Sequence, residues 1–134
     1  MEDRLIRFPK RNSQIIDFIG LERRRKITPT DIDGFIDYNG NAFIYFDAKV
    51  EGVPVSWGQR KAYENIVNSH IKGGSKACAF IFRHNTPHEE SVIAKDGIVD
   101  EYYWEGKWAN GNNNTVLQAI EMIEAIWEKS GVSL

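Results

Sequence analysis

Apolar and polar positions follow two different periods along this chain, and those periods predict its strands and helices. Two runs rich in aromatic and β-branched residues, 31–38 and 42–50, are separated by Asn39-Gly40-Asn41, which is a strong β-hairpin signal. The second run is apolar at nearly every position before Asp47, as expected for a central strand covered on both faces. The polar residues at its end therefore need a separate explanation.

Helical spacing first occurs near the start of the chain. In residues 13–22, Ile15, Ile19 and Glu22 fall on one face at i, i+4 and i+7, which predicts a first helix. Gly20 weakens that helix, because glycine disfavours helix interiors.

A helix and a strand are predicted after the hairpin. Ser56-Trp57-Gly58-Gln59 has the form of a capping box, and the helix it begins runs to about Ile71 before Gly73-Gly74. The apolar run 77–82 reads as a buried strand. Strand, helix and strand then make a βαβ unit, so the strands at 42–50 and 77–82 should be parallel.

The last third of the chain carries weaker signals. We expect a loop at 86–90 and a short, peripheral hairpin of 91–95 and 99–104 around Asp96-Gly97. A final helix over 115–129 follows, with an apolar stripe that is ordinary amphipathic packing. The stripe consists of Val116, Ile120, Ile123 and Trp127.

The alternation of side chains across a strand sorts the residues of the first hairpin by face. Apolar residues occupy the even positions, whereas every charged residue of the two runs occupies an odd one. Both odd sets share a face only if paired residue numbers sum to an even value, which needs an odd-length turn such as 38–40 with Gly40 left-handed. We predict this register, because it places the apolar residues of both strands on one face and the charged residues of both strands on the other.

Composition narrows the class of protein. With 134 residues and 42% hydrophobic content, the chain is long enough for one domain over 1–134. A net charge of -2 leaves nucleic-acid binding to a local patch. The single cysteine, Cys78, lies in an apolar run and excludes an intramolecular disulfide. No membrane span or secretory signal is visible, so we expect a cytoplasmic protein.

Charged residues gather where the predicted register brings the two strand ends together. Asp31 or Asp33 should lie close to Asp47 and Lys49. Converging carboxylates suit Mg²⁺ or Mn²⁺, and a lysine beside them can orient or deprotonate the attacking water. An ion-pair network that closes a strand end is the structural alternative, and the pattern alone leaves both open.

At these residues the sequence resembles the PD-(D/E)XK nuclease superfamily. That pattern is an acid, then acid-x-Lys on the next strand, then often a helix bearing a glutamine: here Asp33, Asp47-Ala48-Lys49 and Gln59. The phrase 27–34 with Gly58-Gln59-Arg60 looks most like small stand-alone nucleases of bacteriophages and prophages, some of which resolve Holliday junctions. Gln59 and Tyr63 also match the Q-x-x-x-Y element of RecB-type and lambda-exonuclease-like relatives.

The resemblance implies an α/β, restriction-endonuclease-like (αβββαβ) three-layer core with a mixed central sheet, followed by a C-terminal β-hairpin and helix. It implies that Asp33, Asp47 and the Ala48 carbonyl bind Mg²⁺ or Mn²⁺, with Asp31 and Glu22 as further candidates. Lys49 would assist the water, Gln59 would brace the site, and Tyr63 would support it. In two respects the chain departs from the pattern: Asp47 replaces the commoner glutamate, and no clear strand precedes Asp31.

The implied function is metal-dependent hydrolysis of DNA, most simply by a structure-selective endonuclease acting on branched DNA. An exonuclease of the RecB type and a catalytically weak nucleic-acid or protein-binding module are the alternatives. A homodimer would suit two-fold junctions, and the aromatics Tyr102, Tyr103, Trp104 and Trp108 are either its interface or additional core. Electrostatic DNA contacts are expected from Arg23, Arg24, Arg25, Lys26, Arg60, Lys61 and Arg83.

Overall fold

The computed structural model describes residues 17–134. Asp31–Leu134 form one compact unit, and residues 17–30 belong to a separate unit; these described residues include the 3-10 helix η2 (Arg24–Lys26). Within the described part of the chain, no helix is both long enough and apolar enough to cross a membrane.

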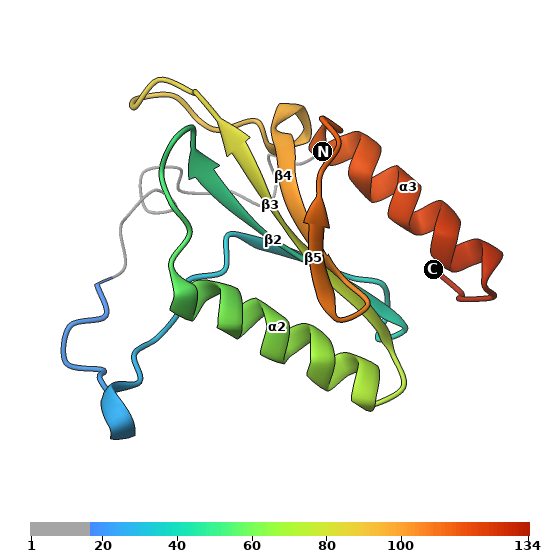
Figure 1. Cartoon of the computed structure of the whole chain (residues 1–134), viewed down its shortest axis with the longest axis horizontal. Helices are drawn as coiled ribbons and strands as arrows, with labels where there is room; N and C mark the ends of the chain where they lie inside the picture. Colours follow the sequence, from blue (N-terminus) through green and yellow to red (C-terminus); the bar gives the residue numbers. More distant parts are fainter. Residues whose placement is uncertain (1–16) are drawn as a thin grey trace, which may run out of the picture. The chain divides into compact units, whose positions relative to one another are not determined.

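A five-stranded mixed sheet forms the centre of the larger unit (Figure 1). The strands lie in chain order across the sheet; β2 and β3 are parallel, and the other neighbours are antiparallel. The bounds are β1 (Gly34–Asp37), β2 (Ala42–Val50), β3 (Lys76–His84), β4 (Ile98–Trp104) and β5 (Lys107–Asn110). The predicted parallel pairing of the βαβ unit is thereby confirmed.

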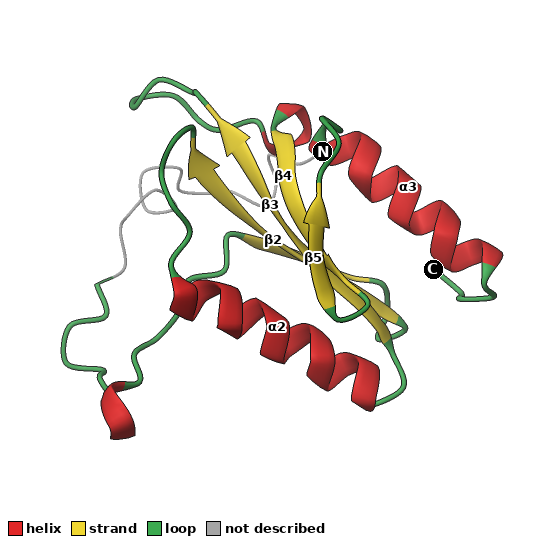
Figure 2. Ribbon diagram, viewed as in Figure 1, coloured by secondary structure: helices red, strands yellow, loops and turns green. Residues whose placement is uncertain are grey.

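Two helices enclose the sheet, one on each face (Figure 2). Helix α2 (Trp57–Lys72) begins at the Ser56 cap and ends at Gly73, as predicted. Helix α3 (Val116–Lys129) begins at Thr115, where Gln118 completes a reciprocal capping box. The result is a three-layer α/β arrangement, which agrees with the predicted fold in outline.

Parity along the strands decides which helix each side chain meets. The even residues Ile44 and Phe46 pack in the core under α3, whereas the odd residues Phe43 and Tyr45 pack in the core under α2. Cys78 lies in the α3 core, fully buried, and that burial raises the pKa of its thiol.

The predicted hairpin register is confirmed. Gly34 pairs with Phe46 and Asp37 with Phe43, so paired numbers sum to an even value throughout. The turn has an odd length as expected but spans 39–41, one residue later than predicted: Asn39 and Gly40 both have positive φ, and the Tyr38 N–H donates to the Ala42 carbonyl. Asp33 and Asp47 consequently approach the same side of the sheet.

Strand β1 is shorter than the predicted run 31–38, because it begins only at Gly34. Immediately before it, the Asp33 carboxylate accepts the Ala48 N–H at 2.8 Å. The Asp33 side chain, and not a backbone carbonyl of residues 31–33, therefore accepts this N–H. Residues 31–33 lie outside the strand.

The prediction of a first helix over 13–22 is wrong where it can be compared. Residues 13–16 lie outside the described residues, and residues 17–22 contain a turn and no helix. Gly20 has a φ of +88°, which a right-handed helix cannot contain, and Ile19 is 88% exposed instead of buried. Asp17 accepts the Ile19 N–H, a local bond that competes with helix formation.

The predicted hairpin around Asp96-Gly97 is also wrong. Residues 94–96 form the 3-10 helix η3 (Ala94–Asp96), and β4 instead turns into β5 through Glu105-Gly106. Both turn residues have positive φ, as a tight two-residue hairpin turn requires. Nor is β4 peripheral, because it pairs with β3.

The described elements follow the predicted core only from its second strand onward. Residues 17–33 contain no strand before β1, and only two strands precede α2 in the described part of the chain. The strand–strand–helix–strand order agrees with the expectation.

Candidate functional site

Asp47 is the central residue of the candidate site. It lies on the odd, α2-facing side of β2, and its side chain is only 2% exposed. Its Oδ1 accepts a hydrogen bond from the Tyr63 hydroxyl at 3.2 Å, but its Oδ2 has no hydrogen-bond partner among the described residues. Burying a carboxylate oxygen that accepts no hydrogen bond is costly, so a nearby positive charge is needed to compensate for it.

Asp33 and Lys49 adjoin that carboxylate, as predicted. Asp33 reaches β2 through its bond to the Ala48 N–H, and Lys49 Nζ lies 3.5 Å from Asp47 Oδ2. Lys49 stands two residues after Asp47 on the same strand face, which is why the acid-x-Lys spacing brings the two charges together. The structure thus assembles the two acids and the lysine that the sequence selected.

The charges around Asp47 hold its proton more tightly than usual. Burial raises its pKa first, followed by the proximity of the negatively charged Asp33 carboxyl group; Lys49 and Tyr63 act in the opposite direction. The net effect is a pKa of about 6.

Tyr63 connects the site to α2. It is 1% exposed, and its hydroxyl donates toward Asp47 Oδ1 and the Phe46 carbonyl at 3.2 and 3.4 Å. Burial and the nearby carboxylates raise the pKa of the phenol, so this hydroxyl is a fixed donor. Tyr63 therefore positions the carboxylate, consistent with the predicted supporting role.

Gln59 lies one helical turn before Tyr63 on the same face of α2. Its backbone N–H donates to the Ser56 hydroxyl at 3.1 Å, which confirms the first half of the predicted capping box. Its side chain is half-buried, and its role in bracing the site stays a prediction.

Two of the cations expected to contact DNA already have partners within the protein. Arg60 makes a bidentate pair with Glu101 and lies 4.8 Å from the centre of the Trp108 ring. Arg83 donates to Asp100 at 3.1 Å and to the carbonyls of Val50 and Val53.

The Arg83 contacts show a role that sequence reasoning missed. One guanidinium ties β4 to the connection between β2 and α2, just beyond Lys49. The sequence shows only an arginine at the end of a predicted strand. It does not show which backbone carbonyls the guanidinium will bond.

The remaining predicted residues stay as predictions. Lys61 is half exposed beside Glu64 and Trp57. Asp31 is exposed, and its charge contributes to the raised pKa of Tyr63. Glu22 and the cations Arg23, Arg24, Arg25 and Lys26 are exposed within residues 17–30.

The predicted aromatic interface is corrected in part. Tyr102 and Tyr103 are 7% and 5% exposed, and Trp108 packs beside Tyr103 in the α2 core. Trp104 stacks on Trp127 under α3, with ring centres 5.9 Å apart. These rings are core residues, so they do not form a free dimer surface.

The donor set fits a hard divalent cation. No cluster of three or more His, Cys, Asp or Glu side chains occurs in residues 17–134, but the carboxyl groups of Asp33 and Asp47 lie close enough to interact. Mg²⁺ commonly uses one or two carboxylates and keeps several waters, and Asp47 Oδ2, which accepts no hydrogen bond, is available as a ligand atom.

A second feature, a surface cavity, lies away from the candidate site. A cavity of about 570 Å³ opens between the ends of α2 and α3, with Ile71, Lys76 and Trp127 in its lining. Lys76 begins β3, whereas Asp47 pairs with Ile81 farther along that strand. We place the candidate site at the buried Asp47 carboxylate, because charged side chains converge there and the cavity is distant from them.

Comparison of the chain with protein-family models, curated proteins and solved structures finds no match. The evidence for a function is therefore the arrangement of side chains around Asp47 and the order of Asp33, Asp47-Ala48-Lys49 and Gln59 in the sequence.

Proposed function

We propose that this protein is a divalent-metal-dependent nuclease of PD-(D/E)XK type that cleaves DNA as a structure-selective endonuclease acting on branched substrates. The observation that carries this proposal is the buried Asp47 Oδ2, which lacks a hydrogen-bond partner among the described residues and lies beside Asp33 and Lys49.

Each side chain has a defined task in this proposal. Asp33 and Asp47, with the Ala48 carbonyl, would hold Mg²⁺ or Mn²⁺, and the bound ion would supply Lewis acidity toward water and the phosphoryl oxygens. Tyr63 keeps Asp47 oriented through its hydroxyl. Lys49 holds the attacking water or accepts its proton, and Gln59 braces the water from α2.

Metal binding is testable without any nuclease assay. Titration of Mn²⁺ into the protein, followed by electron paramagnetic resonance, should show one or two bound ions that Mg²⁺ displaces. Asp47→Asn should weaken binding at least tenfold, because it removes a charged ligand. Asp96→Asn, in an exposed pair with Lys95, is the matched control and should bind like wild type. Equal binding by both variants would remove Asp47 from the metal site.

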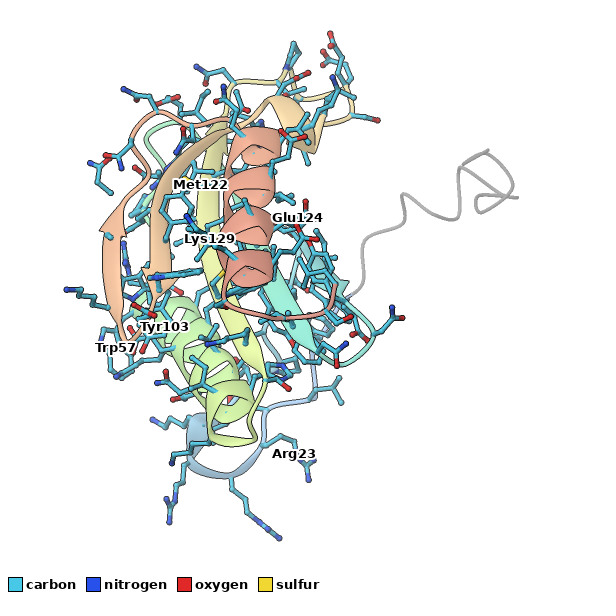
Figure 3. All side chains as sticks on the ribbon, turned by 90° about the vertical axis from the view of Figure 1, so that its right-hand side faces the viewer. Arg23, Trp57, Tyr103, Met122, Glu124 and Lys129 are labelled. Carbon is cyan, nitrogen blue, oxygen red and sulfur yellow. The ribbon has the colours of Figure 1, made fainter. Side chains whose placement is uncertain are left out.

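Cleavage is tested on labelled four-way junctions, flaps, single strands and linear duplexes with Mg²⁺, Mn²⁺ or EDTA. Lys49→Ala should lower the cleavage rate by roughly 10²-fold or more, in line with the loss of a general acid–base group. Lys129→Ala, on α3 at the other face of the sheet (Figure 3), should cleave like wild type. If Lys49→Ala and wild type behave alike on every substrate, the enzymatic proposal is wrong.

Product lengths and binding separate the alternatives. Internal cuts near a branch point support the endonuclease, whereas a ladder of mononucleotides supports the RecB-type exonuclease. Binding to DNA without any metal-dependent cleavage supports the binding module. Sedimentation of the protein with and without a four-way junction tests the proposed homodimer.

A further inference from the structure

Four aromatic rings form a row on the α2 side of the sheet. Phe35 stacks on Tyr45 with ring centres 5.3 Å apart and planes 13° apart, Tyr45 stacks on His70 at 5.7 Å, and Phe43 stacks on His70 at 3.9 Å. The Tyr45 hydroxyl also lies 2.8 Å from His70 Nε2. The row is therefore held in place by both packing and a hydrogen bond.

Phe35 is the exposed end of this row. Its side chain is 55% exposed, although burying a phenylalanine side chain would stabilise the fold. Among the phenylalanine, tyrosine and tryptophan residues of 17–134, only Phe35 and Trp57 are exposed. A ring that is fixed on one side and open to solvent is already arranged to receive another planar group.

The position of Phe35 relates the ring to the candidate site. Phe35 and Tyr45 form the cross-strand pair next to Asp33 and Asp47 on the same face. Two residues along a strand span about 6.6 Å, so the exposed ring lies within the reach of one nucleotide from the carboxylates.

We propose that Phe35 stacks on an unpaired nucleobase of the DNA strand whose phosphodiester group lies at Asp33 and Asp47. This inference depends on the proposed function for the identity of the ligand, and it adds a substrate class: DNA with an unpaired nucleotide beside the cleaved bond. A base inside a continuous duplex has both faces covered by its neighbours, so its face is not free to stack on Phe35.

The negative charges near Phe35 favour an uncharged ring over a cationic side chain for binding the DNA strand at this position. Asp33, just before β1, and Asp37, at its end, flank Phe35, and this negative edge repels phosphates until a cation binds. Stacking is uncharged and accepts any base, so it can orient the strand where a lysine would instead pair with these acids. Its contribution should also be independent of salt, unlike that of phosphate contacts.

The test measures binding alone. Fluorescence anisotropy of labelled oligothymidine of about 12 nucleotides, within the range that single-strand sites cover, is recorded with Ca²⁺, and a denaturing gel identifies any cleaved sample. Phe35→Leu keeps the apolar volume and removes the ring; Phe35→Trp enlarges the ring. Ile126→Ala, which trims an exposed apolar residue on α3, is the control.

We expect Phe35→Leu to weaken binding of the single strand by roughly tenfold, Phe35→Trp to bind at least as tightly as wild type, and Ile126→Ala to leave binding unchanged. The Phe35→Leu effect should stay constant as salt is raised and should nearly vanish on a blunt duplex of equal length. Equal binding by Phe35→Leu and wild type would overturn the inference, as would a wild type that binds no oligonucleotide.

The two proposals fail in different experiments. An unchanged cleavage rate in Lys49→Ala removes the nuclease proposal while the anisotropy assay can still show stacking. Cleavage that depends on Lys49, together with unchanged binding by Phe35→Leu, removes the stacking inference alone.

Discussion

The Asp47 carboxyl group is the central group of the candidate site. Its carboxylate is buried beside another acid, so in the absence of a cation its ionisation is opposed by the protein. A nearby lysine and a tyrosine hydroxyl reduce this penalty only in part, since the pKa is still about 6. The residue therefore favours either a proton or a cation.

Removing the ionisable group should change how stability depends on pH. The pKa of Asp47 is about 6 in the folded protein, above its ordinary value of 3.8, so protonation stabilises the fold. That contribution is present below about pH 3.8 and is lost as the pH rises through about 6, to the extent of roughly 3 kcal/mol. In EDTA, Asp47→Asn should therefore gain stability relative to wild type between about pH 4 and pH 7.5.

Urea denaturation of both proteins at the two pH values measures this change. Asp96→Asn serves as the control, because its carboxylate is mostly exposed in a surface pair. A stability difference that does not vary with pH would show that Asp47 ionises freely.

The Tyr63 hydroxyl can be removed without disturbing its ring. Its hydrogen bond lowers the pKa of Asp47, so Tyr63→Phe should raise that pKa above about 6. Carbon-13 NMR titration of the Asp47 carboxyl group measures the shift. Tyr45→Phe, whose lost hydroxyl is paired with His70, should leave the Asp47 titration in place. A lower pKa in Tyr63→Phe would mean that the hydroxyl does not stabilise the carboxylate.

At the scale of elements, the turns decide where the strands pair. Asn39-Gly40 predicts a turn because both residue types accept positive φ and both flanking runs are rich in aromatic and β-branched residues. Glu105 and Gly106 also have positive φ, but glutamate rarely does, so the sequence did not predict this two-residue turn. Asp96-Gly97 looked like a turn and instead lies where η3 ends and β4 begins.

Two glycines should respond to alanine in opposite directions. Gly40 has a φ of +81° and open space where a Cβ would lie, so Gly40→Ala should cost about 1 to 2 kcal/mol through the backbone alone. Gly58 is helical, in the first turn of α2, with equally open space. Gly58→Ala should stabilise by roughly 0.5 to 1 kcal/mol. Chemical denaturation of both variants checks the sign; a shared sign would mean that backbone conformation does not control either effect.

Across the whole molecule, the sheet separates two cores with different contents. The α3 core holds aliphatic and aromatic side chains from the sheet and from α3, whereas the α2 core shares its face of the sheet with Asp47. Sequence parity predicted this division, because the pleat sends alternate residues to opposite faces. The path of the connection after β2 could not be predicted, since it depends on which carbonyls Arg83 meets.

The α3 layer can be tested with two isoleucines on one helix. Ile123 is 1% exposed and Ile126 is 46% exposed. Ile123→Ala should cost about 2 to 5 kcal/mol, because it removes buried methyl groups and leaves a cavity, whereas Ile126→Ala should cost well under about 1 kcal/mol. Thermal and urea unfolding should agree on this order. Equal losses would contradict the packing of α3 on the sheet.

Cys78 has a practical consequence for studying the molecule. It is the single cysteine of the chain, fully buried in the α3 core, and burial raises the pKa of its thiol. Thiolates react with maleimides and thiols do not, so the native protein should resist labelling while folded. A cysteine introduced at an exposed position would then carry a spin label or dye at one defined place, with the native sequence otherwise intact.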